Sequence, residues 1–130
     1  MKVLIFGGLG FVGRSLEKCL LAEGHEVYTA SRTSHDKKNH FKVDITKASA
    51  FESIGIKPNI VLNCASRIPQ VGKSSRDADF VKNVFTTNVV GGLNIANWSR
   101  AIDASLVINY STLVVVNKPW PVPLREDFEN

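Results

Sequence analysis

Short apolar runs alternate with segments of helical periodicity along most of the chain. Residues 2–6 form a nearly continuous apolar run that ends at Gly7, which is typical of a strand buried on both faces of a sheet. Over residues 10–23 the apolar positions recur at the spacing of one helix face: Val12, Leu16, Cys19 and Leu20. Gly24 is well placed to end this helix, and residues 27–30 suit a second strand. A strand, a glycine turn, a helix and a strand within about 30 residues predict a βαβ unit with parallel strands and a right-handed crossover.

The same alternation continues to residue 110. Strands are predicted at residues 41–43, 60–64 and 106–110, a short helix at 48–54 and a long helix at 80–100. Residues 68–79 are polar and predict a loop, and prolines at positions 119, 121 and 123 predict an irregular stretch from Asn117 onward. We therefore predict one domain over residues 1–130, of the α/β class. Its core is a doubly wound parallel sheet of the Rossmann-like type, incomplete, with about five strands.

Composition narrows the class of protein without indicating a function. The chain has 130 residues, a net charge of +4 and 44% apolar residues, which excludes a disordered tail, a collagen-like repeat and a disulfide scaffold. No block of five like charges suggests a nucleic-acid-binding arm, and no apolar run reaches the roughly 20 residues of a membrane helix. Cys19 and Cys64 are expected to be reduced, buried thiols of a cytoplasmic protein. The histidines lack the spacing of metal ligands, so we expect no metal site.

The strongest candidate for a binding site is the glycine cluster between the first strand and the first helix. Five of its residues are expected to contact a dinucleotide: Gly7, Gly10, Phe11, Val12 and Gly13. Glycines permit a tight turn, let backbone amides approach a pyrophosphate and let the helix pack close to its strand. The amino-terminal end of the helix then attracts the phosphates. The alternative is a purely structural turn, which would not need so many glycines.

The end of the second strand decides between the two nicotinamide dinucleotides. An NAD site usually places an acidic residue there to bind the ribose 2′-hydroxyl. This chain has Ser31 and Arg32 instead, with Lys37 and Lys38 nearby. A guanidinium can bind a 2′-phosphate through two hydrogen bonds and a hydroxyl can donate to it, so we expect NADP, with NAD as the alternative cofactor. A solvated basic loop would have the same composition.

Several short motifs, in order along the chain, resemble those of the extended short-chain dehydrogenase/reductases, the NAD-dependent epimerase/dehydratase family. Besides the glycine loop they are Val43-Asp44-Ile45, Asn63-Cys64-Ala65-Ser66, the helix motif from Asn88 to Asn94, and Tyr110-Ser111-Thr112. The resemblance implies that Asp44 and Ile45 lie at the adenine of the cofactor. It implies that the cofactor is lined by one strand end, at Cys64, Ala65 and Ser66. It also implies that Ser111 and Thr112 bind and polarise a substrate carbonyl during reversible hydride transfer on a nucleotide sugar.

Three of these residues have simpler explanations. Asn88 falls on the apolar stripe of the long helix (Val81, Val84, Phe85, Gly91 and Ile95), so its amide should point inward and find partners. It either holds the backbone of the cofactor site, as the resemblance implies, or is a satisfied core asparagine. Asp44 could equally be a turn or cap residue, and Thr112 a hydroxyl that ends a strand.

The chain also departs from the family pattern. Members are usually longer, and their catalytic Tyr-x-x-x-Lys pair would lie beyond Asn130; neither Tyr28 nor Tyr110 has a lysine four residues on. Val116 and Asn117 stand where the family has Tyr and Gly. We therefore expect the amino-terminal, cofactor-binding part of a longer enzyme, inactive alone. The alternative is a stand-alone NADP-binding sensor or interaction module, and the exposed edge of an incomplete sheet would favour a homodimer.

Overall fold

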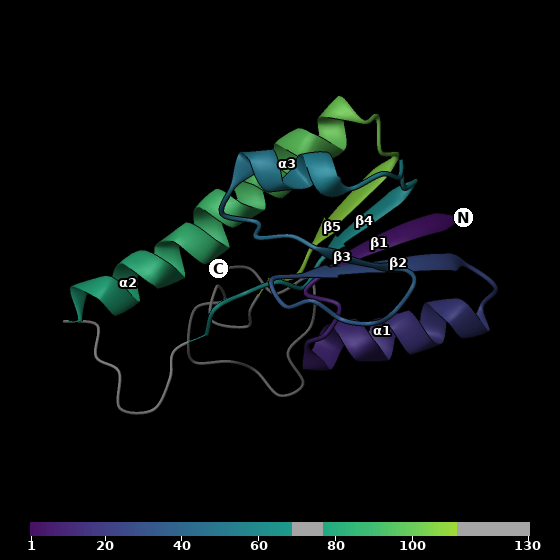
Figure 1. The fold of residues 1–130 in the computed structure, drawn as a ribbon, viewed down its shortest axis with the longest axis horizontal. Helices are drawn as coiled ribbons and strands as arrows, with labels where there is room; N and C mark the ends of the chain where they lie inside the picture. Colours follow the sequence, from purple (N-terminus) through teal and green to yellow (C-terminus); the bar gives the residue numbers. More distant parts are fainter. Residues whose placement is uncertain (69–76, 112–130) are drawn as a thin grey trace, which may run out of the picture.

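A computed structural model describes residues 1–68 and 77–111 of the chain. Five strands form one parallel sheet in the order β3-β2-β1-β4-β5. They are β1 (Lys2–Phe6), β2 (Glu26–Ser31), β3 (His40–Lys42), β4 (Ile60–Asn63) and β5 (Leu106–Asn109). Helix α1 (Phe11–Ala22) covers one face of the sheet, and the 3-10 helix η1 (Ala48–Ser53) and helix α3 (Gly91–Ala101) cover the other (Figure 1). This arrangement confirms the predicted Rossmann-like α/β fold.

Strand β1 lies at the centre of the sheet and is buried on both faces. Val3 and Ile5 pack with Val27 and Leu62 on the side of α1. Leu4 and Phe6 belong to the core on the opposite side. Because successive side chains of a strand point to opposite faces, a continuous apolar run supplies both layers, as the sequence predicts.

Three aromatic rings hold η1 and α3 against β1. The ring centroid of Phe6 lies 5.5 Å from that of Phe51 on η1 and 5.8 Å from that of Trp98 on α3. Phe51 and Trp98 are themselves 5.7 Å apart. Phe6 and Phe51 are buried, so the cluster combines hydrophobic burial with the preferred tilted and edge-to-face ring geometries.

Helix α1 ends where the sequence predicts. The backbone of Gly24 has a φ of +76°, in the left-handed region that favours glycine. The amide of His25 donates to the carbonyl of Leu20 at 3.0 Å, which closes the last turn.

The face that α1 presents to the sheet differs from the predicted one. Leu16 and Leu20 pack on the sheet, and Gly13 is buried. Val12 and Cys19, which were predicted on the same face, are exposed. The close approach of α1 at Gly13 turns the helix so that Gly13, Leu16 and Leu20 face the core. The prediction of a buried Cys19 is therefore wrong, and Cys64 is only partly buried.

The predicted long helix is present but changes type in the middle. Helix α2 (Ala78–Phe85) continues into a π-helical turn, η2 (Thr86–Val90), and then into α3. Gly91 and Ile95 of α3 are buried, whereas Val81 and Phe85 of α2 are 44% and 58% exposed. The wider π turn shifts the angular positions of the residues, so the apolar positions before and after it do not share one buried face.

Strand β5 pairs with β4 at the edge of the sheet, and all of its residues are exposed. Among the described residues, no helix has the length and apolar character needed to cross a membrane.

We expect Phe51→Ala to lower the free energy of unfolding by about 3–5 kcal/mol, because it removes a buried ring that contacts both other rings of the aromatic cluster and leaves a cavity. Phe85→Ala is the matched control, because Phe85 is 58% exposed. Urea unfolding followed by tryptophan fluorescence measures both. Equal losses in the two variants would contradict the assignment of Phe51 to the core.

Candidate functional site

The turn between β1 and α1 brings three backbone segments into close contact. Gly7 has a φ of +75°, and a Cβ on it would lie 2.7 Å from the amide nitrogen of Ala65, after β4. A Cβ on Gly13 would lie 2.4 Å from the carbonyl oxygen of Gly7. Side chains at these two positions would push α1 and β4 away from the turn, so the local packing requires glycine there.

The same turn leaves the amino-terminal end of α1 uncapped by any side chain. Its N-cap residue is Gly10, which has no side chain to bond to the free amides, and the first turn contains no acidic residue. The backbone amides at this end and the positive end of the helix dipole suit a phosphate.

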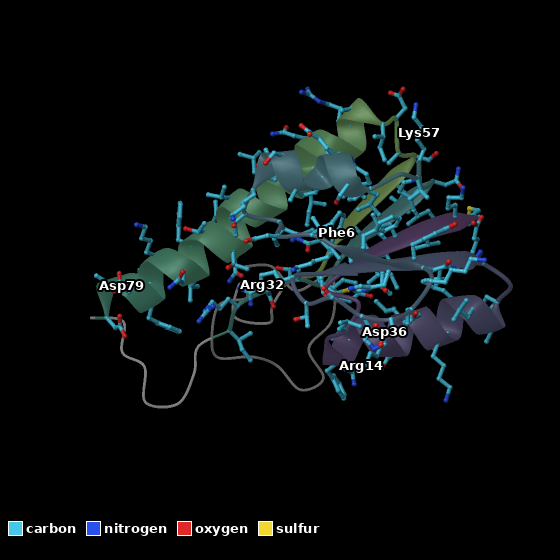
Figure 2. The ribbon with its side chains drawn as sticks, in the orientation of Figure 1. Phe6, Arg14, Arg32, Asp36, Lys57 and Asp79 are labelled. Atoms are coloured by element: carbon cyan, nitrogen blue, oxygen red, sulfur yellow. The ribbon has the colours of Figure 1, made fainter. Side chains whose placement is uncertain are left out.

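A cavity of about 180 Å³ lies beside this turn, between the carboxyl ends of β1, β2 and β4. Eight of the residues predicted to bind cofactor line it: Gly7, Gly10, Ser31, Arg32, Ile45, Cys64, Ala65 and Ser66. Leu9, Ala30, Val43 and Thr87 line it as well. Among these described residues Arg32 alone carries a formal charge, and Figure 2 shows it at the carboxyl end of the sheet.

The hydroxyl of Ser31 is used within its own turn. It donates to the carbonyl of Thr33 at 2.9 Å. This bond shapes the backbone around Arg32, and the donation of the Ser31 hydroxyl to a 2′-phosphate stays a prediction. We call residues 31–33 the 2′ turn.

Asp44 has a local structural role. One carboxylate oxygen, Oδ1, accepts from the backbone amide of Thr46 at 3.1 Å and from its hydroxyl at 2.8 Å. Partial burial opposes the charged form, but these hydrogen bonds, with Lys47 and Arg32 nearby, hold the pKa of Asp44 below its ordinary value. This geometry matches the turn-residue alternative; the neighbours Val43 and Ile45 line the cavity and Asp44 does not.

A larger cavity of about 600 Å³ lies at the carboxyl ends of β4 and β5. Six of the predicted site residues line it: Val12, Cys64, Ala65, Ser66, Asn88 and Ser111. The full segment Cys64–Ser66 lines both cavities, so the two adjoin at the end of β4. Burial raises the pKa of the Cys64 thiol at this junction. Arg67 is the only formally charged residue among the described ones that line the larger cavity.

Asn88 lies in the π turn, and its side chain is exposed rather than buried. Its carboxamide oxygen accepts from the backbone amide of Arg67 at 2.7 Å, and its nitrogen donates to the carbonyl of Arg67 at 2.9 Å. The prediction of an inward-pointing, buried amide is wrong because the π turn rotates this position out of the core. The two hydrogen bonds hold the backbone that follows β4.

Two further asparagines lie at the ends of β4 and β5: Asn63, which the sequence indicated only as the first residue of a strand-end motif, and Asn109, which was not identified from the sequence. Asn63, which is 7% exposed, donates to the carboxamide oxygen of Asn109 at 2.6 Å and accepts from the amide of Ala65 at 3.1 Å. Their place at the carboxyl ends of two predicted strands could have identified them, because ligands of parallel sheets bind beyond these ends.

The remaining predicted site residues are Phe11, Gly13 and Thr112. Phe11 is 91% exposed and lines neither cavity. Gly13 is buried behind the turn. Thr112 lies outside the described residues. Among the described residues, no group of three or more His, Cys, Asp and Glu side chains could hold a metal ion.

A model of the family described as "NAD dependent epimerase/dehydratase family" matches residues 3–130. The chain is 29% identical to a UDP-glucose 4-epimerase of Mycolicibacterium smegmatis, over 98% of this chain and 44% of that protein. It is 26% identical to UDP-glucuronic acid decarboxylase 1 of Danio rerio, over 98% of this chain and 31% of that protein. The chain thus spans less than half the length of these curated relatives.

Two solved structures are similar in fold and in sequence. A crystal structure of a UDP-galactose 4-epimerase has a TM-score of 0.77 and 26% identity, with 98% of this chain and 43% of that chain covered. The Bordetella bronchiseptica enzyme WbmG, in complex with NAD and UDP, has a TM-score of 0.72 and 25% identity, with 96% and 42% covered.

Gly13→Ala should lower the free energy of unfolding by about 1–3 kcal/mol, because its Cβ would be placed 2.4 Å from a backbone oxygen. It should also weaken dinucleotide binding, because α1 must move away from the turn. Gly55→Ala is the control, since nothing lies within 4 Å of a Cβ there. Thermal unfolding and cofactor titration measure the two effects; a Gly13→Ala variant as stable as Gly55→Ala would contradict the packing described.

Proposed function

The chain belongs to the NAD-dependent epimerase/dehydratase family, and from this premise we propose that it forms the dinucleotide-binding part of a nucleotide-sugar epimerase, dehydratase or reductase that prefers NADP. The observation that carries the proposal is the smaller cavity, which is lined by both the glycine turn and Arg32. A dinucleotide placed there would have its phosphates at the start of α1 and its adenosine ribose at the 2′ turn.

The preference for NADP is supported by the charges at the 2′ turn. The smaller cavity has Arg32 among its described lining residues and no carboxylate. The ribose 2′-hydroxyl of NAD would therefore lack its usual acidic acceptor, while a 2′-phosphate would gain a charge-assisted hydrogen bond. Solved relatives contain NAD, so NAD is the competing assignment.

The larger cavity supports a nucleotide-sugar substrate. It lies next to the junction at Cys64–Ser66, where we propose that the nicotinamide ring enters, and it is lined by polar groups of both strand ends. Ser111 and Arg67 line this cavity. We expect the hydroxyl of Ser111 to donate a hydrogen bond to a substrate oxygen, and the positive charge of Arg67 to attract an anionic group such as a phosphate. The related enzyme WbmG was crystallised with UDP as well as NAD.

The cofactor assignment predicts the effect of removing Arg32. Wild-type protein should bind NADP about tenfold more tightly than NAD, a difference of about 1.4 kcal/mol. Arg32→Ala should remove most of this preference and leave NAD binding nearly unchanged, whereas Ser31→Asp should shift the preference towards NAD. Lys38→Ala is the charge-matched control, because it removes one positive charge from the same exposed loop without changing the cavity lining.

Titration calorimetry with both cofactors gives these affinities directly. Equal wild-type affinities for NAD and NADP would show that the cavity does not select NADP. An Arg32→Ala variant that weakens both cofactors alike would show that Arg32 does not contact the 2′-phosphate.

The 130-residue chain by itself should bind dinucleotide without converting a nucleotide sugar. Hydride transfer from a sugar carbon requires a base for the hydroxyl proton. Tyr28 does not suit this role: its hydroxyl donates to Glu26 at 2.6 Å, and this bond, with desolvation and the charge of Glu26, raises the pKa of Tyr28. Tyr28 also lines neither cavity.

Absorbance at 340 nm and product analysis with UDP-glucose and UDP-galactose test this prediction on the purified chain. Turnover above background would show that these residues contain a complete catalytic set. Dinucleotide binding without turnover is the expected result.

A further inference from the structure

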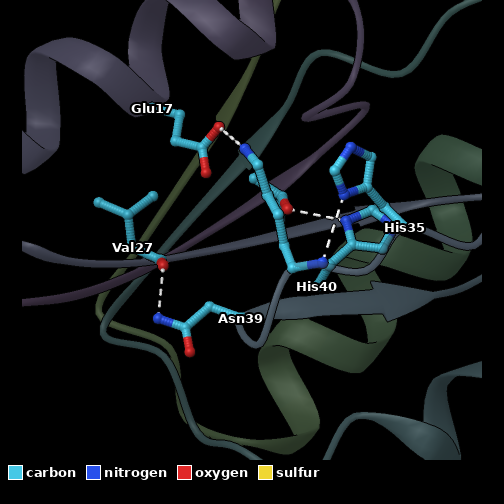
Figure 3. Close-up of polar contacts among 7 residues, drawn as sticks. Glu17, Val27, His35, Asn39 and His40 are labelled. Atoms are coloured by element: carbon cyan, nitrogen blue, oxygen red, sulfur yellow. Dashed lines mark hydrogen bonds and ion pairs between the residues drawn. The ribbon is translucent and has the colours of Figure 1, made fainter.

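His40, the first residue of β3, connects the buried sheet to the 2′ turn. It lies opposite Thr29 in the parallel register of β2 and β3. One ring nitrogen, Nδ1, is 2.8 Å from the hydroxyl of Thr29. The other, Nε2, is 3.0 Å from the carbonyl oxygen of Thr33 and 3.2 Å from the hydroxyl of Ser31. Figure 3 shows the ring of His40 within the polar contacts of the loop between β2 and β3.

The partners of the two ring nitrogens define which one carries the hydrogen. A carbonyl oxygen only accepts, so Nε2 must be the N–H that donates to Thr33. With the hydrogen on Nε2, Nδ1 is an acceptor, and the hydroxyl of Thr29 donates to it. Thr29 is fully buried, so its hydroxyl needs this acceptor.

The carbonyl of Thr33 thus receives two hydrogen bonds, one from Ser31 and one from His40. This carbonyl belongs to the residue that follows Arg32. Arg32 itself is exposed, so its direction depends on the backbone on either side of it. Two donors on one carbonyl fix that backbone, and the donation from His40 ties it to the sheet.

Thr29 also contacts the glycine turn. A Cβ on Gly8 would lie 2.5 Å from the Cβ and Cγ2 atoms of Thr29, so the two residues pack directly together. The amide of Gly7 donates to the carbonyl of Ala30, the next residue of β2, at 2.8 Å. The position of His40 is therefore fixed relative to the turn that we propose binds the phosphates.

We propose that His40 is the positioning residue that sets the preference for NADP over NAD, by holding the 2′ turn so that Arg32 meets the 2′-phosphate. The proposal rests on the proposed role of Arg32 in cofactor binding. His40 does not touch the cofactor in this assignment; it acts through the carbonyl of Thr33.

The remaining contacts of the loop supply a control. The rings of His35 and His40 are 5.9 Å apart, and His35 Nδ1 accepts from the amide of Lys37 (Figure 3). The ammonium group of Lys37 forms an ion pair with Glu17 of α1 at 2.7 Å. No hydrogen bond of His35 to the 2′ turn is found within residues 1–68 and 77–111.

Two substitutions of His40 separate positioning from stability. His40→Asn keeps an oxygen near the place of Nδ1, which can accept from Thr29, and removes the donor to Thr33. His40→Gln extends an amide nitrogen towards the place of Nε2, which can donate to Thr33, and removes the acceptor for Thr29. The first variant should lose cofactor selectivity, whereas the second should mainly lose stability.

The NADP and NAD affinities of wild type, His40→Asn, His40→Gln, His35→Asn and Arg32→Ala are measured by titration calorimetry, with melting temperatures recorded alongside. We expect His40→Asn to lower the ratio of NADP to NAD affinity about fivefold at unchanged NAD affinity. His40→Gln should keep most of the wild-type ratio. His35→Asn should keep the wild-type ratio. Combining His40→Asn with Arg32→Ala should reduce the ratio no further than Arg32→Ala alone.

A wild-type ratio in His40→Asn, or equal weakening of NAD and NADP, would overturn the proposal. If His40→Gln has as low a ratio as His40→Asn, the effect of His40 on selectivity does not act through its hydrogen bond to the carbonyl of Thr33. If Arg32→Ala removes the preference and His40→Asn does not, only the role of His40 fails. If the wild type shows no preference or Arg32→Ala leaves it intact, the proposed cofactor assignment fails, and the role of His40 with it.

Discussion

The arrangement of the site depends on one close approach of backbone to backbone, where β1 turns into α1. A side chain on Gly7 would meet the backbone of Ala65, and one on Gly8 would meet Thr29. These contacts bring the ends of β1, β2 and β4 together at a single point. The two cavities adjoin there because the segment after β4 is pressed against the glycine turn and lines both of them. The glycines therefore serve the packing of the sheet and the shape of the site at once.

Carboxamides hold the segments around this point without adding charge. Asn88 accepts from the backbone amide of Arg67 and donates to its carbonyl. Asn63 donates to Asn109 between the ends of β4 and β5. The side-chain nitrogen of Asn94 donates to the carbonyl of Ile45 at 2.9 Å. A Cβ on Gly91 would lie 2.6 Å from Ile45, so α3 sits close enough for that last bond. A carboxamide both donates and accepts, which lets a single side chain fix a backbone segment. Among the described residues that line the cavities, only Arg32 and Arg67 carry a formal charge.

Sequence patterns predicted the features that depend on local rules. The apolar run of β1, the glycine that ends α1 and the alternation of strands and helices follow from side-chain periodicity and from backbone freedom at Gly24. The alternation also predicted a parallel sheet, but the order of its strands, β3-β2-β1-β4-β5, required the structure. The exposure of Asn88 could not be predicted, because it arises from a π turn that has no periodic signature. The hydrogen-bond partners of Ser31 and Asp44 also required the structure. Each side chain has several backbone groups nearby in the chain, and the sequence does not show which of them it bonds to.

The polar groups in and near the 2′ turn divide into those already bonded and those still available. The hydroxyl of Ser31 is bonded to Thr33, and Oδ1 of Asp44 is bonded to Thr46. Arg32 contributes to the lowered pKa of Asp44, but it is the weakest of the causes that lower it, after the hydrogen bonds from Thr46 and the charge of Lys47. Oδ1 of Asp44 is bonded within its own turn, and among the described residues no hydrogen bond or ion pair joins Asp44 to Arg32. The guanidinium of Arg32 is therefore available to a ligand. The hydrogen bonds around it fix the backbone from which its side chain extends.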